Sequence, residues 1–567
     1  MQIADSHLND ASLEEPWQRQ RLRVPRENAR LIERPPLEQC VEPILQNVKQ
    51  LENSDVNIQG RPLSHMRTWS RRELLQVART YTADLLGNSL EKPDDEHSAA
   101  LPATVIVGGH QPTLFHAGVW VKNFAIHRLA QQTGGVSVNL VVDNDTRSVC
   151  SIRVPSGTRN HPRRTSIPFD DPATTGPWEE ARIVNRSLAG SFAERVESAM
   201  AVWSIRPILS EMWPAVLARA EVTDLWADCL TAGRASLERH WGVRNLELPI
   251  SRMCTVDSFL WFASHLFAHA GRFRDLHNDV LAQFRKVNRV RSRTHPVPEL
   301  MEQDGWIESP FWVWNQGDSQ RGRLMVKQVG KEVHLAANEI PFARLPLTPT
   351  MDACCAVEVL RELPARGIRL RTRALSTTLF SRLCLGDWFV HGIGGSKYDE
   401  MTDRIIARFF GMRPPKFLTL SGTLHLPLAE PHPISPEEIR RLENQRRDVR
   451  YNPDRYLTPE QREASVSLLA EKERLIAAQH MATSREHQSR RERRQHAREN
   501  HERYLAFKDV NRKLAHFTRD IQSHLEQQIE AAHQMQEANL ILQNREYPFC
   551  LFPEDTIRPF MTSILKS

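Results

Sequence analysis

The sequence predicts an α/β fold that combines a parallel core with a long helical insertion and a C-terminal α-helical coiled coil. Residues 103–145 contain two apolar runs separated by a glycine turn and a helical stretch, the order of a strand–helix–strand crossover. From 460 to 547 the chain has no proline, and its later part keeps near-heptad apolar spacing. The 567 residues are 40% hydrophobic and 25% charged, which excludes global disorder.

Changes in composition divide the chain into four parts. Residues 1–99 are expected to form an N-terminal helical region that closes in a polar break. Residues 100–430 are expected to form the α/β core, interrupted at about 178–345 by a helical and small β insertion. We expect a coiled-coil helical hairpin over 431–545 and a final segment, 546–567, that packs back on the core because it is too apolar for a solvated tail.

The core begins with a β-branched run at 103–107, helical spacing at 119–131 and a second apolar run at 136–142. A unit of this length forms a right-handed parallel crossover. Further strands are expected at 368–370, 388–391 and 416–420, with a further helix at about 398–410. The insertion between them contains helices over 178–241, an amphipathic stretch over 256–291 and short antiparallel strands over 311–335.

Two caps mark helix starts in the C-terminal third. Ser435 and Thr458 each place a hydroxyl before a proline, with an acidic or amide side chain three residues later, which is the capping-box arrangement. One continuous helix over the rest of this part would exceed about 100 Å. We therefore expect a long hairpin, packed on itself or on a partner, with its turn near 483–500.

The turn after the first core strand is the first candidate site. Ligands collect at the carboxyl ends of parallel strands, where the next helix offers free N–H groups and a partial positive charge. The pattern is neither a standard dinucleotide motif nor a P-loop, and the alternative is a tight turn whose histidines cap backbone groups. The candidate residues are Gly108, Gly109, His110, Gln111, His116 and Gly118.

The second candidate is a glycine turn that follows the strand at 388–391. Gly394 and Gly395 free the backbone, Ser396 can cap the helix, and Lys397 can neutralise a phosphate or a carboxylate. The alternative is a glycine turn with an exposed lysine. We expect this turn and the turn near 108 to form neighbouring walls of one anion-receiving cleft.

Two further constellations are weaker. Asp143 and Asp145 follow the second strand and could orient an amine or hold a ribose hydroxyl or Mg²⁺, although helix capping explains them equally well. Arg371 and Arg373 alternate so that both can face an anion, and a solvated strand face is the alternative. No metal site is predicted, because no His/Cys set has ligand spacing.

Composition also limits location and partners. The eight cysteines form no CxxC pair, which predicts reduced thiols. The chain shows no secretory signal, and its most apolar stretch, 258–270, is too short for a membrane span, so we expect a cytoplasmic protein without a membrane partner. The net charge is only +6, and the basic runs at 285–293 and 485–503 read as solvated helix faces, so nucleic acid is not an expected partner.

Taken together, these features resemble the cysteine-adding enzymes of bacillithiol biosynthesis, the cysteine ligase family. The matching segments are Gly109 to Gln111 with Gly118, the acidic cluster 143–145, residues 371–379 with their Leu-Ser-Thr-Thr pattern, residues 389–395 and Leu551-Phe-Pro553. The resemblance implies a Rossmann-like core related to class I aminoacyl-tRNA synthetases, a coiled-coil dimerisation domain, and a reaction that joins cysteine to the amine of a glucosaminyl malate.

The leading hypothesis is a dimeric ligase-like enzyme that condenses a carboxylate, such as cysteine, with an amine and forms a C–N bond between small-molecule substrates. The two glycine turns, with His110, His116 and Lys397, would stabilise phosphate charge, and Asp143 or Asp145 would orient the amine. The sequence does not determine the cofactor, and ATP or another nucleotide is compatible with the cleft. The alternative is a non-catalytic coiled-coil scaffold that keeps a vestigial ligand pocket.

Overall fold

The computed structural model describes residues 22–87, 101–147, 149–172, 176–483 and 490–566. It divides into two compact units. Unit 1 contains the described residues of 1–156, 164–427 and 545–567, and unit 2 contains those of 157–163 and 428–544. The predicted polar break at 91–99 lies outside the described residues.

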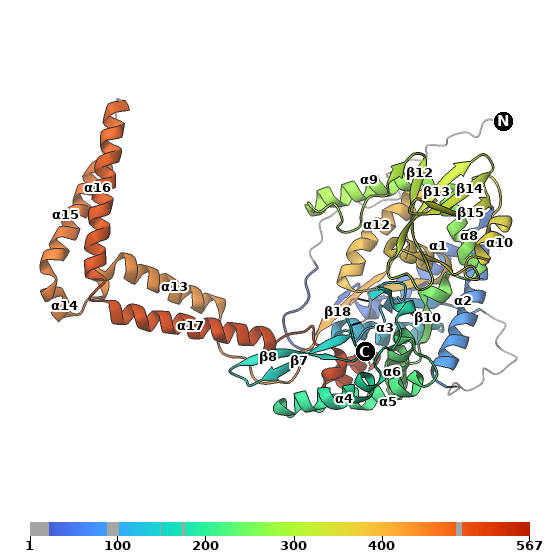
Figure 1. Ribbon diagram of the computed structural model, residues 1–567, viewed down its shortest axis with the longest axis horizontal. Helices are drawn as coiled ribbons and strands as arrows, with labels where there is room; N and C mark the ends of the chain where they lie inside the picture. Colours follow the sequence, from blue (N-terminus) through green and yellow to red (C-terminus); the bar gives the residue numbers. More distant parts are fainter. Residues whose placement is uncertain (1–21, 88–100, 148, 173–175, 484–489, 567) are drawn as a thin grey trace. The chain divides into compact units, whose positions relative to one another are not determined.

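Unit 1 is a mixed α/β structure built on a mostly parallel six-stranded sheet (Figure 1). The strands, in spatial order, are β1 (Arg30–Arg34), β18 (Leu418–Thr423), β17 (Trp388–His391), β4 (Val105–His110), β5 (Val136–Val141) and β10 (Leu246–Pro249). All neighbours pair in parallel except β1, which joins the edge antiparallel to β18. The crossover expected over 103–142 is therefore present as the parallel pair β4 and β5, and the strands expected at 388–391 and 416–420 lie beside it in the same sheet.

The order of these strands reverses at β4. From β4 the chain continues outward through β5 and β10 on one side, and it later adds β17 and β18 on the other side. Where the order reverses, the connections of neighbouring strands leave in opposite directions and open a crevice at the carboxyl ends. In this sheet that point lies between β4 and β17.

The described N-terminal residues, 22–87, belong to unit 1 and pack on its core, whereas a separate helical region was expected over 1–99. β1 is a strand of the main sheet, α1 (Val41–Glu52) packs on α2 (Leu63–Leu85), and α2 packs on β10. Asn47 on α1 donates to the backbone of Asp387 and Lys416, and Arg67 on α2 forms an ion pair with Asp387. These buried polar contacts join the N-terminal helices to the core.

Helices cover the sheet around the strand ends of interest. α3 (Ala117–Gln132) packs on β4, β5 and β18, and α18 (Glu554–Lys566) packs on α3. α12 (Ile393–Phe410) follows β17 and packs on β18 and on α9 (Ala270–Asn288). Each of α3 and α12 begins directly after a strand, so both helix N-termini lie at the carboxyl-end edge of the sheet.

The insertion expected at 178–345 differs from its prediction in two ways, because one of its segments is a core strand and its amphipathic stretch is divided. It contains the core strand β10 between α6 (Trp226–His240) and α7 (Ile250–Met253), besides α4 (Arg186–Met200) and α5 (Leu209–Ala220). The amphipathic stretch 256–291 is two helices, α8 (Asp257–Ala268) and α9, because the chain turns at His269.

A second, antiparallel sheet follows α9. Its strands are β11 (Glu302–Gln303), β12 (Trp306–Asn315), β13 (Gly322–Val329), β14 (Glu332–Ala337) and β15 (Ile340–Pro346). β16 (Ile368–Thr372) also joins this sheet, by pairing with β12, and then leads into α11 (Ala374–Phe380). The run at 368–370 is therefore a strand of the second sheet and not, as expected, of the parallel core.

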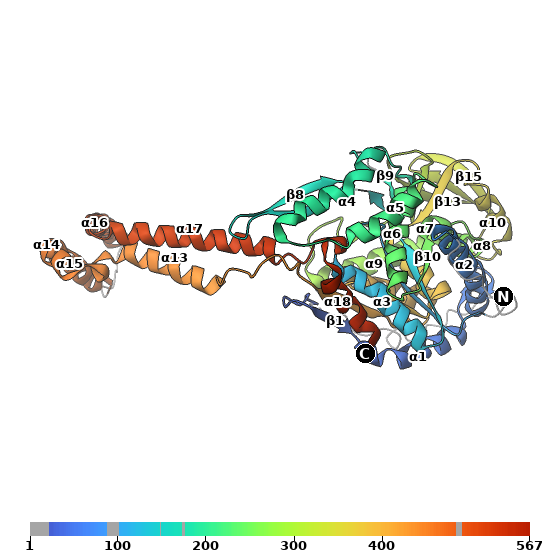
Figure 2. The same cartoon turned by 90° about the horizontal axis from the view of Figure 1, so that it is seen from below.

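The described residues of unit 2 contain two packed pairs of helices instead of the single predicted hairpin. α13 (Pro436–Tyr451) packs on α17 (Arg519–Leu542), and α15 (Val466–Thr483) packs on α16 (Arg490–Leu514), as Figures 1 and 2 show. The short α14 (Pro459–Ala464) precedes α15. The long apolar pattern breaks at 515–518, between α16 and α17. Residues 484–489, part of the predicted turn and basic run, lie outside the described residues.

Both predicted caps of unit 2 are confirmed. The Ser435 hydroxyl accepts from the backbone N–H of Glu438, and Thr458 forms a capping box with Gln461. Within the parts of the chain that the structure describes, no helix combines the length and the apolar character that a bilayer span requires.

The C-terminal segment returns to unit 1 and is buried there. Phe549 is fully buried and lies with its ring centroid 4.3 Å from that of Trp120 on α3 and 5.5 Å from that of Phe115. The backbone N–H of Phe549 donates to the carbonyl of Phe115. The chain end therefore packs directly on the turn between β4 and α3.

Candidate functional site

Three strand ends meet at one edge of the parallel sheet. β4 pairs with β17 so that Gly108 lies opposite Val390, and with β5 so that Gly109 lies opposite Leu140. The turns that follow β4 and β17 are therefore neighbours, as the sequence predicts. Whether a cleft opens between them depends on the side chains and segments that pack on each turn.

His116 closes the start of α3. Its Nδ1 accepts from the backbone N–H of Gly118 (3.1 Å), which makes it the N-cap of the helix. Its Nε2 lies 3.4 Å from Arg545 Nη2 and 3.5 Å from a carboxylate oxygen of Glu546, and a backbone bridge joins His116 to Pro548. Burial lowers the pKa of His116 to about 4. The start of α3 is thus covered by the C-terminal segment.

His110 and the nearby glycines also serve packing. The His110 ring lies edge-on to Phe115, and burial lowers its pKa to about 3. A Cβ on Gly109 would lie 2.7 Å from the carbonyl oxygen of Leu140. Lys122 Nζ donates to the carbonyl of Gly109 (2.9 Å), and burial lowers the pKa of this lysine to about 8. The turn after β4 is therefore filled by the protein's own side chains.

Two other glycines of this turn are constrained in the same way. A Cβ on Gly118 would lie 2.2 Å from the carbonyl oxygen of Gly422 on β18. A Cβ on Gly108 would lie 3.1 Å from the side chain of Ile126. Close packing of α3 on the sheet explains both residues without a ligand.

The start of α12 is open by comparison. Gly394 and Gly395 are exposed, and a Cβ on Gly392 or Gly394 would meet no heavy atom within 4 Å. No side chain of the described residues caps this helix. These glycines form the first turn of α12 and not the expected loop, and the Ser396 hydroxyl donates to the carbonyl of Ile393. An uncapped N-terminus of an eighteen-residue helix favours an anion.

A buried ion-pair network anchors α12 to β17. His391 Nε2 lies 2.9 Å from a carboxylate oxygen of Asp399, which also forms a 2.6 Å ion pair with Arg382. Burial alone would raise the pKa of Asp399, but Arg382 and His391 outweigh it and hold this pKa below its usual range. Lys397 is half-buried on the same first turn. These buried contacts therefore hold the uncapped start of α12 in a fixed position against β17.

The two aspartates after β5 have different surroundings. Asp143 is 4% exposed, and its oxygens accept from the backbone N–H of Ser251 (2.9 Å) and from the Ser251 hydroxyl. Burial and the nearby Glu179 raise the pKa of Asp143 to about 7. Asp145 instead faces a cavity. Only one of the two predicted carboxylates is therefore placed to meet a ligand.

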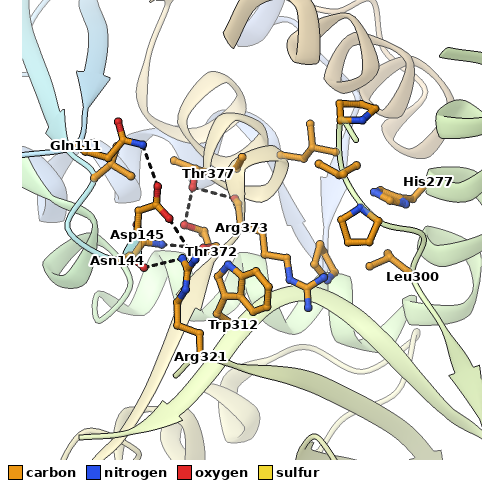
Figure 3. Close-up of a pocket in the computed structure, with 17 residues that line it drawn as sticks. Gln111, Asn144, Asp145, His277, Leu300, Trp312, Arg321, Thr372, Arg373 and Thr377 are labelled. Atoms are coloured by element: carbon orange, nitrogen blue, oxygen red, sulfur yellow. Dashed lines mark hydrogen bonds and ion pairs between the residues drawn. The ribbon is translucent and has the colours of Figure 1, made fainter. Parts of the chain in front are cut away.

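A pocket of about 300 Å³ lies beside these strand ends, within unit 1 (Figure 3). At one end, Gln111 Nε2 donates to Asp145 (2.9 Å), and Arg321 Nη2 lies 3.2 Å from the other oxygen of that carboxylate. Arg321 also donates to the carbonyl of Asn144. This hydrogen-bonded group forms the polar end of the pocket. The lining also contains apolar residues, among them Pro296, Pro298, Pro310 and Leu300, and Figure 3 shows Leu300 on the side opposite Asp145.

Arg373 lies on the pocket wall and is incompletely satisfied. It forms a 2.7 Å ion pair with Glu308, and its guanidinium lies 4.1 Å from the centroid of a Trp312 ring. Its Nε is buried and has no hydrogen-bond partner among the residues that the structure describes. Because this atom is sealed from solvent, it offers no contact to a ligand, and Arg373 acts on the pocket through the positive charge of its guanidinium.

The other predicted arginine is not at the pocket. Arg371 binds both carboxylate oxygens of Glu179, at 2.9 and 2.7 Å, and the two side chains are buried. Its role is structural, because the pair joins β16 to the segment after β9 (Gly176–Pro177). Of the two alternating arginines, Arg371 is therefore structural and Arg373 faces the cavity.

The sequence did not indicate several pocket residues. Trp312, Arg321 and His277 come from the second sheet and from α9, and no local motif connects them with the strand ends. Over the described ranges, no group of three or more His, Cys, Asp or Glu side chains could hold a metal ion. A scan against models of protein families and a search of curated proteins found no match.

Proposed function

We propose that unit 1 is a ligase-like enzyme that condenses a carboxylate with an amine at the carboxyl-end edge of its parallel sheet. The observation that carries this proposal is the parallel pairing of β4 with β17, which makes the turn that holds Gln111 a neighbour of the start of α12. The pocket itself is lined by Gln111 and Asp145 and by no residue of the first turn of α12, so the predicted cleft between the two glycine turns is not formed by both of them. Ligands of open α/β sheets bind at such a reversal of strand order.

The strand order supports a Rossmann-like core. Numbered in chain order, the five parallel strands β10, β5, β4, β17 and β18 follow the order 3-2-1-4-5. This is the arrangement of the first five strands of dinucleotide-binding sheets. It suits a nucleotide such as ATP, with its phosphates at the uncapped start of α12.

In this proposal each group at the edge has one task. The backbone N–H groups of α12 and Lys397 would hold the phosphate groups of a nucleotide, and ATP bound there would supply the activation that a carboxylate needs before it reacts with an amine. Arg373 holds a carboxylate in the pocket, and Asp145 orients the amine. We assign no phosphate contact to His110 or His116, because internal contacts occupy both.

The resemblance to the bacillithiol cysteine ligase family suggests the first substrates to test, cysteine and an amino sugar. The same resemblance leads us to propose a homodimer formed through the helices of unit 2. Exposed apolar side chains in α15 and α16, among them Ile476, Tyr504 and Leu505, suit such a contact. All eight cysteines are free thiols, which is compatible with the cytoplasmic location that we propose.

A non-catalytic scaffold is the second candidate, and the covered start of α3 favours it. If the pocket no longer binds a substrate, contacts that cover the turn before α3 cause no loss of function. The same scaffold would still use unit 2 to recruit a partner. The two candidates differ in whether a product forms.

The decisive experiment incubates the full chain with ATP, cysteine and amino sugars and measures products by mass spectrometry. An amide product with stoichiometric release of phosphate or pyrophosphate supports the ligase. Lys397→Ala should lower the rate by about tenfold or more, as expected when a charged contact to phosphate is lost. Lys331→Ala, on the distant turn after β13, is the matched control and should keep the wild-type rate. No product with any amine would favour the scaffold.

A further inference from the structure

His277 lines the same pocket at the end opposite Asp145 and has no role in the function proposed above. It lies on α9, is 3% exposed, and in Figure 3 its ring lies beside Leu300 with an edge toward the pocket interior. It is the one imidazole among the residues that line this pocket. Leu300 beside it is apolar, so the ring nitrogen that faces the pocket is the group that can form a hydrogen bond with a ligand at this point of the wall.

The neighbouring asparagine determines which ring nitrogen carries the proton. Asn278 Nδ2 donates to the carbonyl of Leu300 (2.9 Å), and its Oδ1 accepts from the Leu300 N–H (2.9 Å). These two bonds fix the amide orientation, so the atom 3.1 Å from His277 Nδ1 is an acceptor. Nδ1 must therefore carry the hydrogen, and Nε2 keeps a free lone pair.

The charges around the ring keep it neutral. Burial lowers the pKa of His277 to about 4, the bond to Asn278 opposes this shift, and Arg373 adds to it. The other charged groups that act on the ring are Glu308, from the packed second sheet, and Arg285, from its own helix. At neutral pH the imidazole is therefore an acceptor and not a cation.

Nε2 makes no hydrogen bond within the described chain, and it is not among the unpaired atoms that are sealed from solvent, so it is open to the pocket that the residue lines. Water can satisfy an acceptor that is open to the pocket. A ligand that displaces this water loses affinity unless it supplies an N–H or O–H donor of its own. A carboxylate at the same place would face a lone pair and lose its own hydration. The ring thus discriminates by chemistry and not by size alone.

We propose that His277 is a specificity-determining residue that selects organic acids with an amine or hydroxyl at the end remote from their carboxylate. The carboxylate would lie toward Arg373, and the remote N–H or O–H would donate to His277 Nε2. This inference rests on the pocket that the proposed function uses, but it concerns binding and not turnover. Sites built to bond a donor reject analogues that lack it.

Binding to the full chain tests this inference in the absence of ATP. The probes are ω-amino and ω-hydroxy acids of three to six carbons, each matched with the unsubstituted acid and the dicarboxylate of equal length, and the measurement is calorimetric affinity. At the best-fitting length, the donor-bearing acid should bind about tenfold tighter than both matched acids, the effect of one good hydrogen bond. In His277→Phe the three affinities should become nearly equal.

Two further variants separate selectivity from folding. His277→Gln keeps an acceptor and should retain part of the preference even if His277→Phe is destabilised. His269→Phe changes a histidine of the α8–α9 junction that does not line the pocket, and it should leave the preference unchanged. Nitrogen NMR should show the resonance lost in His277→Phe as an unprotonated Nε2 that shifts when a donor-bearing acid binds.

The outcomes for this inference and for the proposed function are distinct. Equal binding of matched acids, no binding of any acid, or a preference that survives in His277→Phe would overturn the role of His277. A preference that depends on His277, in a protein that forms no product with ATP, would remove the ligase and keep the ligand class of the pocket.

Discussion

The starts of α3 and α12 have equivalent places in the fold and opposite surroundings. Each helix follows a parallel strand, each begins near glycine, and the two strands are direct neighbours. At α3 the histidine cap, Lys122 and the segment around Pro548 fill the space. At α12 two exposed glycines and the half-buried Lys397 leave it open.

This difference shows that the segments packed on a strand end, rather than the sequence motif that follows the strand, decide whether this end is available to a ligand. Pro548 closes the first turn from a position 432 residues later in the chain than His116, a contact that no local pattern contains. Near the second turn the His295 ring lies 5.8 Å from that of Tyr398, and this remote segment leaves Gly394 and Gly395 exposed. The sealed turn acts as a structural joint, and the open one is the candidate site.

The largest expected effect comes from adding one methyl group to each turn. Gly118→Ala should lower the free energy of unfolding by roughly 2–4 kcal/mol, because its Cβ would lie 2.2 Å from a β18 carbonyl and backbone must move. Gly394→Ala should change it by less than about 0.5 kcal/mol or stabilise slightly, because its Cβ meets no atom within 4 Å and alanine favours helix. Urea unfolding of both variants gives the comparison.

Equal losses in the two variants would contradict the contrast between a sealed and an open turn. Gly190→Ala is the control, since it also lies within a helix, α4, and its Cβ would likewise meet no atom within 4 Å. It should behave like Gly394→Ala.

A second pair of variants should give a smaller, crossed result. His116→Ala removes the N-cap of α3 and should cost about 1 kcal/mol of stability while leaving ATP affinity unchanged. Lys397→Ala should weaken ATP binding by about tenfold and leave stability within about 0.5 kcal/mol. Thermal unfolding and ATP calorimetry on both proteins measure the two effects. If ATP binding depended on His116 and not on Lys397, the turn before α3 would be the nucleotide site and the start of α12 would be structural.

Local periodicity predicted much of the core, whereas remote contacts decided the site. The strands around Gly108 and Val390 and the caps at Ser435 and Thr458 follow from short-range patterns, which is why they were predictable. The strand at 246–249 was missed, because four residues between helices carry too little signal.

The pocket was predictable only in part, for the same physical reason. Gln111 and Asp145 could be placed because strand ends of one sheet converge. Arg373 could be proposed but not distinguished from Arg371, since the carboxylate that occupies Arg371 lies 192 residues away in the sequence. His277 carries no local signal, because its importance arises from the loop that packs against it.

The smallest expected effect concerns the charge at the open turn and depends on pH. Glu400 lies one turn after Lys397, and burial raises its pKa to about 7, a shift that Lys397 opposes. A raised carboxyl pKa means that the folded state holds the proton more tightly, so stability is lost as pH rises from about 4.5 toward 7.

Glu400→Gln should therefore unfold like the wild type near pH 4 but be more stable at pH 8, by less than about 1 kcal/mol because the side chain is partly exposed. Glu358→Gln, an exposed site on α10 (Cys354–Arg361), should show no such pH-dependent difference. An equal advantage of Glu400→Gln at both pH values would mean that this carboxylate is not held out of water at the start of α12, and the open turn would then be more hydrated than its packing indicates.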